Sequence, residues 1–166
     1  MFSLSTKRVD PEALRRRLPA TGAGGFVSFE GRVRDRNHGR KVRMLEYEAY
    51  EELAAQEGER IMAEAGEKFA VRVAMCVHGV GRLFPGDIAV WVGVMAEHRA
   101  AAFEACRYVI DEVKARVPIW KREHYYHAPA KWIGPVAAPP RKLAQTGRKR
   151  KTRRRPKSAR VPSPGA

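Results

Sequence analysis

Residues 96–123 read AEHRAAAFEACRYVIDEVKARVPIWKRE, and this stretch decides the fold. Apolar side chains recur in it every three or four positions, which predicts an amphipathic helix from about residue 98 to residue 116. Pro118 ends the helix, because proline lacks a backbone N–H and restricts the residue before it. A strand rich in basic residues is predicted directly afterwards. The expected buried stripe of the helix consists of Ala102, Phe103, Cys106, Ile110, Val113 and Val117.

Two basic residues mark the ends of this helix. Arg99 lies in the first turn and Lys114 in the last, fifteen positions further along. A helix rises about 1.5 Å per residue, so their Cα atoms are about 22 Å apart. One small ligand therefore cannot contact both side chains within one chain. Either the two residues serve separate sites, or a two-fold dimer brings the start of one helix to the end of the other.

The rest of the chain predicts strands and helices without an internal repeat. Strand segments alternate with a period of two or are rich in valine, whereas helix segments keep the longer period. Residues 35–41 are expected to form a mobile loop or a wide hairpin, and residues 84–87 to join two strands as a hairpin. This order predicts an α+β domain with a mainly antiparallel sheet. The predicted strands are residues 2–9, 26–34, 42–50, 71–83, 88–96 and 119–126, and the other predicted helices are residues 11–18 and 51–69.

Charge is divided unevenly along the 166-residue chain, whose formal net charge is +15. Residues 141–166 hold eleven Lys or Arg and no acid, which leaves 22 basic against 18 acidic residues, or +4, in residues 1–140. The tail has one Leu, one Val and no aromatic residue, so it cannot bury enough surface to offset the entropy of ordering. We therefore expect one domain over residues 1–140 and a disordered, Lys/Arg-rich tail over residues 141–166.

Neither a membrane segment nor a metal site is indicated. No run of eighteen apolar residues occurs, and the N-terminus has no apolar signal-peptide core, so a cytoplasmic protein without a membrane partner is expected. Cys76 and Cys106 fall within apolar patterns and predict buried, reduced thiols. His124 and His127, three apart on a strand, face opposite sides and make a poor metal pair. We expect neither a metal nor a cofactor.

Basic residues at the ends of predicted elements indicate a site for an anion. Arginine binds phosphate through planar paired donors, and a helix N-terminus adds free N–H groups and a positive dipole. Arg32 and Arg34 alternate with Val33 and are expected to point to the same face of their strand. The alternative interpretation is that these residues are ordinary solvated surface charges. The five residues concerned are Arg34, His98, Arg99, Lys114 and Lys121.

Several motifs, in this order, resemble the large, catalytic subunit family of molybdopterin synthase over about residues 22–132. The resemblance implies an α/β-hammerhead-like fold and a homodimer that binds two copies of a small ubiquitin-like sulfur carrier, giving a heterotetramer. It also implies that the carrier's C-terminal Gly-Gly thiocarboxylate delivers sulfur to cyclic pyranopterin monophosphate and so forms the dithiolene of molybdopterin. The motifs are FEGRVRD at 29–35, LEYEAY at 45–50, PGD at 85–87, HRAAAFEACRYVIDEVK at 98–114 and PIWKRE at 118–123.

The resemblance also implies roles for individual residues. Lys114 and Lys121 match the family's lysines and are expected to act as general acid and base. The implied pocket lies between subunits, which agrees with the separation of Arg99 and Lys114 along the helix. The residues expected to bind substrate are Arg32, Val33, Arg34, His98, Arg99, Lys121, Arg122 and Glu123.

Some positions depart from the family pattern or favour a structural interpretation. Gly79 stands where an arginine is common in the family, and we interpret this turn as structural. Residues 133–140 contain no basic residue after Trp132, where the family often has one. Trp120 and Phe103 lie on apolar faces and are expected in the core rather than stacked on a pterin.

Two competing hypotheses remain at this stage. The first is a protein that binds nucleic acid or another polyanion through the basic tail, although residues 1–140 hold no recognised nucleic-acid motif. The second is a non-catalytic scaffold that only docks the carrier, for which Lys114 and Lys121 would be dispensable.

Overall fold

The structure, a computed structural model, describes residues 1–18 and 21–134. The predicted tail at residues 141–166 lies outside the described residues. Strands and helices are distributed along the whole described chain. They are β1 (Phe2–Ser5), α1 (Pro11–Arg15), β2 (Gly25–Arg32), β3 (Arg36–Asn37), β4 (Arg40–Ala49), α2 (Glu51–Phe69), β5 (Val71–Gly79), β6 (Gly81–Leu83), β7 (Ile88–Ala96), α3 (Arg99–Arg116), β8 (Ile119–Tyr125) and β9 (Lys131–Ile133).

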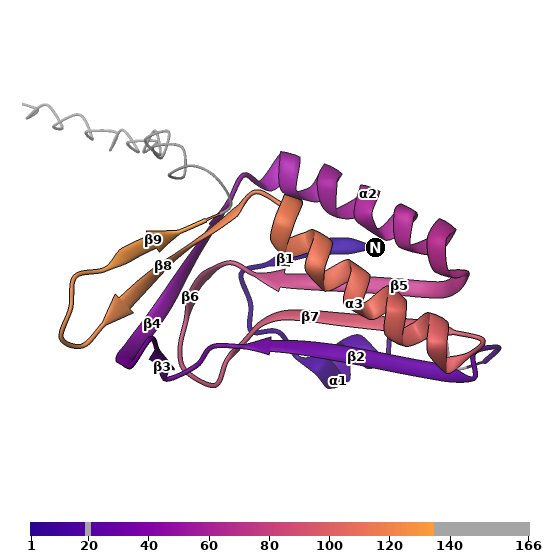
Figure 1. Ribbon diagram of the computed structural model, residues 1–166, viewed down its shortest axis with the longest axis horizontal. Helices are drawn as coiled ribbons and strands as arrows, with labels where there is room; N and C mark the ends of the chain where they lie inside the picture. The colour runs from indigo at the N-terminus through magenta and orange to yellow at the C-terminus, as the bar shows by residue number, and fades with distance from the viewer. Residues whose placement is uncertain (19–20, 135–166) are drawn as a thin grey trace, which may run out of the picture.

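One sheet has the order β1-β5-β7-β2 and is covered on one face by α2 and α3 (Figure 1). Every residue of β7 is buried, because this strand lies in the interior of the sheet. The main core fills the space under the helices, where Ile61, Val92 and Val109 are fully buried. A smaller core on the other face packs α1 and its flanks against Trp91. Lys114, the first predicted lysine, lies on α3, on the face of the sheet that holds the main core.

A second sheet has the order β3-β4-β8-β9, and β6 also pairs with β4 (Figure 1). Among the described residues only β1 and β5 pair in parallel, so the predicted α+β class with a mainly antiparallel arrangement is confirmed. Lys121, the second predicted lysine, lies on β8 of this second sheet. The functional region can therefore form where the two sheets and α3 meet.

The valine-rich run at residues 71–83, predicted as a single strand, is two strands. It breaks at Val80, after which β6 leaves β5 and pairs with β4 of the other sheet. β5 and β7 do pair antiparallel, but β6 intervenes between them, so residues 84–87 do not close a simple hairpin. Gly81 has a φ of 88°, a left-handed conformation that glycine adopts at little cost and that allows the chain to change sheets there.

The segment at residues 35–41 is a tight hairpin rather than a wide or mobile loop. Asn37 pairs with Arg40, and the two residues between them, His38 and Gly39, have φ values of 47° and 77°. Two consecutive positive φ angles match the twist of a two-residue hairpin, and glycine at the second position favours it. The tight turn fixes Asn37 beside β4 and β8.

Helix α3 follows the prediction closely, with one exception. Its buried residues include Ala102, Cys106, Ile110 and Val113 of the expected stripe, and also Ala105 and Val109, which the prediction left out. Phe103, predicted to lie in the core, is 63% exposed. Successive residues of a helix are about 100° apart, so Phe103 points away from the face centred on its buried neighbours. No helix among the described residues is long and apolar enough to cross a membrane.

An ion-pair cluster joins α2 to the last turn of α3. Arg116 donates to both carboxylate oxygens of Glu64, at 2.6 and 3.0 Å, and to Glu57 at 2.7 Å. Tyr108 also donates to Glu64, at 2.6 Å. The hydrogen bonds from Arg116 and then Tyr108 lower the pKa of Glu64 from 4.5 to about 2. The cluster thus holds the end of α3, and with it Lys114, against α2.

We expect the stabilisation from Glu64 to disappear in acid. A carboxyl group whose pKa is lower in the folded state stabilises the fold above its unfolded pKa of 4.5 and loses that effect as the pH falls to about 2. Urea unfolding of the wild type and of Glu64→Gln should therefore differ at pH 7 and converge near pH 2. Glu67→Gln, an exposed change on the same helix, should match the wild type throughout. A difference that persists undiminished at pH 2 would contradict the assignment.

Candidate functional site

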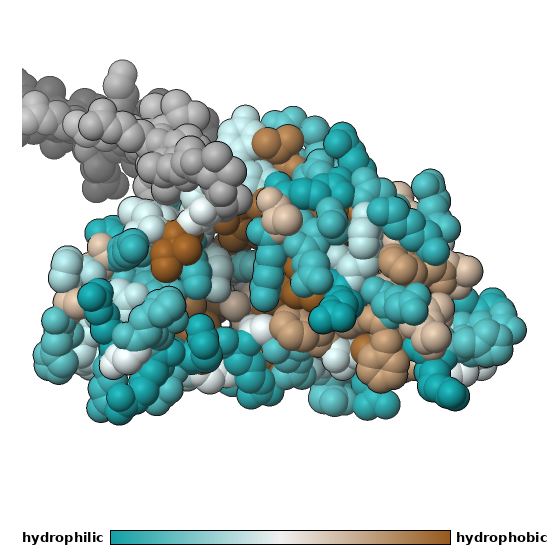
Figure 2. Space-filling model, viewed as in Figure 1, coloured by the Kyte–Doolittle hydropathy of each residue, from teal (hydrophilic) through white to brown (hydrophobic). Residues whose placement is uncertain are grey.

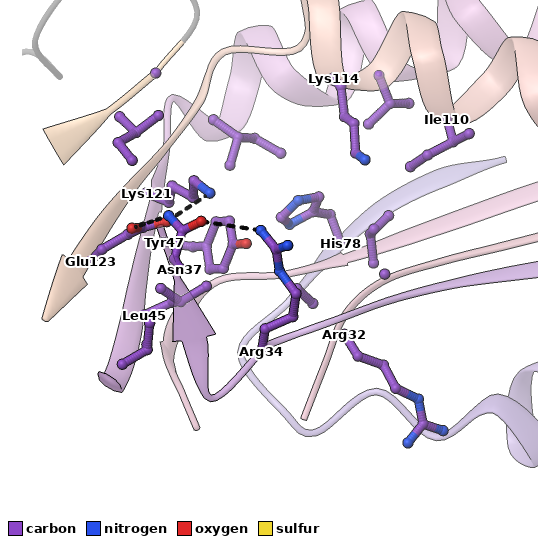
Figure 3. A pocket seen from close by; sticks show the side chains of 18 of the residues that line it. Arg32, Arg34, Asn37, Leu45, Tyr47, His78, Ile110, Lys114, Lys121 and Glu123 are labelled. Carbon is purple, nitrogen blue, oxygen red and sulfur yellow. Dashed lines mark hydrogen bonds and ion pairs between the residues drawn. The ribbon is translucent and has the colours of Figure 1, made fainter. Parts of the chain in front are cut away.

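A pocket of about 570 Å³ lies where the end of β2, the β3–β4 hairpin, β8 and the second half of α3 meet (Figure 3). Ile110, Val113 and Ile119 form part of its apolar wall. Its lining contains several arginine and lysine side chains but one carboxylate, that of Glu123. The polar and charged lining residues are Arg32, Arg34, Arg36, Asn37, Tyr47, His78, Lys114, Lys121 and Glu123.

Glu123 organises one wall of the pocket. It is only 2% exposed, yet it accepts from Lys121 Nζ at 2.9 Å and from Asn37 Nδ2 at 2.7 Å. The Tyr125 hydroxyl donates to the same oxygen as Asn37. Lys121, Glu123 and Tyr125 alternate along β8, so the strand itself places all three side chains on one face. The buried carboxylate therefore fixes the position of the Lys121 amine.

The protonation state of Glu123 follows from these contacts. Burial alone would raise the pKa of the carboxyl group, but hydrogen bonds from Tyr125, Lys121 and Asn37 lower it by more. The pKa of Glu123 is thus below its usual value, and the group is a carboxylate at neutral pH. In return, its hydrogen bond from Tyr125 raises the pKa of the tyrosine hydroxyl, which stays protonated. A negative charge is thereby held beside Lys121 in a pocket that is otherwise cationic.

Arg34 reaches the pocket and Arg32 does not point the same way. Arg34 Nη2 donates to Asn37 Oδ1 at 3.2 Å, which connects it to Glu123 through the Asn37 side chain. Arg32 instead donates to Glu30 at 2.7 and 3.1 Å, and Figure 3 shows its guanidinium turned away from Lys121. The prediction that Arg32 and Arg34 point to the same face of one strand is wrong. The register of β2 is irregular between Gly31 and Arg32, and the strand ends at Arg32, so Arg34 lies beyond it.

Lys114 approaches from the opposite side. It lies in the last turn of α3, and its amine points into the pocket in Figure 3, with Nζ 5.7 Å from the centre of the Phe29 ring. The structure therefore brings Arg34, Lys114 and Lys121 to one cavity from the segment that follows β2, from α3 and from β8. Two amines face the cavity from separate elements, so a bound molecule can meet a lysine on each side.

Several residues predicted to bind substrate lie elsewhere. His98 is the N-cap residue of α3 and Arg99 its first residue, at the end remote from Lys114, and neither lines the pocket. Val33 is buried in a small cluster with Leu45, and its side chain does not line the cavity. Arg122 is absent from the lining as well, because it alternates with Lys121 on β8. Its guanidinium lies 5.8 Å from the centre of the Trp132 ring.

Four polar or charged side chains line the pocket although the sequence did not single them out for the site: Arg36 and Asn37 on β3, Tyr47 on β4 and His78 on β5. The last two form a pair. Their rings meet edge to face with centroids 5.1 Å apart. Burial, and then the charge of Lys114, lower the pKa of His78 to about 4, against the opposing effect of its hydrogen bond to Gly79. Burial, and then the charge of Glu123, raise the pKa of Tyr47 to about 12. Both side chains are uncharged at neutral pH.

The pocket can bind an anionic molecule and exchange protons with it. Arg34 supplies paired donors for a phosphate or carboxylate, and the lysine amines can give or take protons on either side. Residues 1–18 and 21–134 contain no group of three or more His, Cys, Asp or Glu placed to hold a metal ion. Arg34 and the two lysines are suited to acid–base chemistry on an anion.

Comparison with known proteins gives a consistent set of relatives. The family model described as MoaE protein matches residues 4–116. The molybdopterin synthase catalytic subunit of Pyrococcus abyssi is 51% identical over 106 residues, which is 64% of this chain and 72% of that relative.

Solved structures share the fold. The crystal structure of molybdopterin synthase from Staphylococcus aureus is 35% identical with a TM-score of 0.74, and the match covers 79% of this chain and 95% of that one. A protein–protein complex of subunits 1 and 2 of molybdopterin-converting factor from Helicobacter pylori matches with a TM-score of 0.64 at 23% identity, over 76% of this chain and 86% of that one, which is a likeness of fold.

Proposed function

The chain belongs to the MoaE protein family, and on that premise we propose that its pocket transfers sulfur from a thiocarboxylated carrier protein to cyclic pyranopterin monophosphate. It functions as a molybdopterin synthase catalytic subunit, an enzyme of molybdenum cofactor biosynthesis. The observation that carries the proposed chemistry is the Lys121 amine, held at 2.9 Å by a carboxylate that is 2% exposed, in a cavity that Lys114 also lines.

The proposed reaction has two stages for each sulfur. In each round the carrier's thiocarboxylate sulfur attacks a carbon of the pterin substrate and leaves an acyl–sulfur bond between carrier and pterin. In one round the carbon releases its phosphate-ester oxygen, which opens the cyclic phosphate ring, and in the other it releases its oxygen as water. Water then cleaves the acyl–sulfur bond, so the sulfur stays on the pterin and the carrier leaves as a carboxylate. Lys114 and Lys121 exchange the protons of these steps as general acid and base. The Glu123 carboxylate keeps the Lys121 amine in place during both stages.

Substrate binding is assigned to the arginines. Arg34 projects into the cavity beside Asn37 and is placed to hold the substrate phosphate. His98 and Arg99 are too far along α3 to join it from the same chain, so we assign them to the pocket of a second copy. The face around the first half of α3 and β2 gathers apolar side chains (Figure 2), and Phe103 is exposed there. Such a face fits one that a second copy covers.

The proposed partners follow from the same scheme. The carrier is a small ubiquitin-like protein whose C-terminal Gly-Gly thiocarboxylate enters the cationic cavity, where its negative charge is attracted. The Helicobacter pylori protein of the same fold occurs in a complex of two different subunits. We propose a homodimer that binds two carriers, a heterotetramer, in the cytoplasm.

Reconstitution tests the proposal directly. Purified protein is mixed with thiocarboxylated carrier and cyclic pyranopterin monophosphate, and the dithiolene product is quantified after conversion to a fluorescent derivative. We expect product to form in proportion to the thiocarboxylate consumed, with two sulfurs transferred for each pterin. A carrier ending in an ordinary carboxylate is the matched control and should give none. Thiocarboxylated carrier that stays intact in the presence of both components would refute the proposed transfer.

A further inference from the structure

The pocket contains an uncharged corner that the sulfur-transfer scheme leaves without a task. His78 and Tyr47 both line the cavity, and the His78 ring lies between Arg34 and the Lys114 amine in the view of Figure 3. They come from different sheets, β5 and β4, and the edge-to-face contact of their rings fixes their relative position. Two neutral polar side chains thus interrupt a row of cations.

The hydrogen bonding of His78 decides which of its ring atoms is available. Nδ1 lies 2.8 Å from the carbonyl oxygen of Gly79, and a carbonyl can only accept, so Nδ1 carries the proton. The neutral ring then presents a lone pair at Nε2. Nε2 of His78 makes no hydrogen bond within the described part of the chain. It is nevertheless not fully buried, because Arg122 Nε is the only fully buried side-chain nitrogen or oxygen without a partner among the described residues. His78 lines the cavity, so its Nε2 is accessible from there.

The ring is held in this neutral form by its surroundings. Burial, and then the nearby charge of Lys114, keep the pKa of His78 at about 4, so a second proton does not bind near neutral pH. Tyr47, whose pKa is raised to about 12, keeps its hydroxyl proton over the same range. The corner therefore offers a fixed acceptor at His78 Nε2 and a hydroxyl that can donate at Tyr47.

We propose that His78 and Tyr47 form a subsite for the uncharged edge of a planar heterocycle, and so bind the pterin ring of the substrate. A pterin carries ring N–H and amino donors next to a carbonyl acceptor, which complements an acceptor and a donor side by side. Arg34 and the lysines attract the anionic groups of the ligands, whereas this neutral pair selects the ring. The inference rests on the proposed function, because it takes the substrate from it.

Two substitutions of His78 separate this subsite from a purely structural role. Asparagine places an amide N–H near Nδ1 and keeps the bond to Gly79, but it has no atom at Nε2. Glutamine is longer and places an acceptor near Nε2, while it gives up the bond to Gly79. We expect His78→Asn to raise the KM for cyclic pyranopterin monophosphate about five- to tenfold, the value of one lost hydrogen bond, with kcat within about twofold. We expect His78→Gln to stay within about threefold of the wild type.

A binding measurement without the carrier gives a readout that does not depend on turnover. Neopterin, an unphosphorylated pterin, is titrated and followed by its fluorescence, and inorganic phosphate is titrated separately. His78→Asn and Tyr47→Phe should each weaken neopterin binding about five- to tenfold and leave phosphate binding unchanged. His127→Asn, an exposed histidine outside this pocket, should affect neither probe.

Each outcome bears on the proposal. The subsite is refuted if His78→Asn binds neopterin like the wild type, or if Asn preserves the KM while Gln impairs it, the pattern of a structural histidine. Tyr47→Phe keeps the ring contact and tests the corner even where a His78 variant loses its thermal unfolding transition. A wild type that makes no dithiolene but binds neopterin through His78 would refute the proposed function and leave the subsite standing.

Discussion

Replacing Lys121 with alanine is expected to lower the rate of dithiolene formation about a hundred- to ten-thousand-fold, the range of a lost general acid or base. The substitution removes the amine but leaves Glu123 with its two other donors, Asn37 and Tyr125, so the carboxylate is not stranded without partners. The fold should therefore persist, and the loss should appear in kcat. Single-turnover rates with thiocarboxylated carrier measure it, alongside the thermal unfolding midpoint.

A second variant and a control sharpen the interpretation. Lys121→Gln can still donate to Glu123 but has no group that exchanges protons near neutral pH, so it should be as impaired as alanine. Lys131→Ala is the control. Lys131 is an exposed residue of β9 that lies opposite Glu123 in the β8–β9 register but outside the pocket, so this variant should keep the wild-type rate. If Lys121→Ala retains a rate within about threefold of the wild type, general acid–base catalysis is excluded for this residue. The non-catalytic docking scaffold would require Lys114→Ala to keep the wild-type rate as well.

Long periodic segments were predictable because their pattern reports burial directly. The bounds of α2 match the expected 51–69, and α3 begins within a residue of its expected start, since each presents one apolar stripe to a single sheet. The break at Val80 was not predictable in the same way. Valine-rich residues continue on both sides of it, and only the pairing of β6 with β4 shows that the chain has changed sheets. β9, with three residues, was missed because so short a segment has no periodicity to detect.

The charged part of the pocket could be predicted and the neutral part could not. Arg34, Lys114 and Lys121 stand in motifs that resemble a known family, and the structure brings them to one cavity. Asn37, Tyr47 and His78 reach that cavity only through the tight turn after Asn37 and the pairing of β4 with both β6 and β8. Tyr47 lies directly opposite Lys121 in that pairing, a long-range register that no local pattern contains.

Mixing two inactive variants is expected to restore activity if the site is shared between chains. Arg99→Ala and Lys114→Ala should each abolish most activity alone. Along α3 the two positions are about 22 Å apart, so they serve one substrate only if they come from different chains. In a hybrid dimer one pocket then lacks both residues and the other lacks neither. Random exchange makes about half of the dimers hybrid, so the mixture should regain about a quarter of wild-type activity.

The decisive comparison is a pair of variants that damage the same pocket. Arg34 and Lys114 line one cavity of one chain, so a mixture of Arg34→Ala with Lys114→Ala leaves every pocket of every dimer one residue short. That mixture should stay inactive even though its hybrids form equally well, which differently tagged chains and tandem purification can show. Recovery in both mixtures, or in neither, would contradict a pocket built from His98 and Arg99 of one chain and the lysines of another. Recovery in the first mixture alone requires the start of one α3 to lie beside the end of its mate, which no arrangement within a single chain can provide.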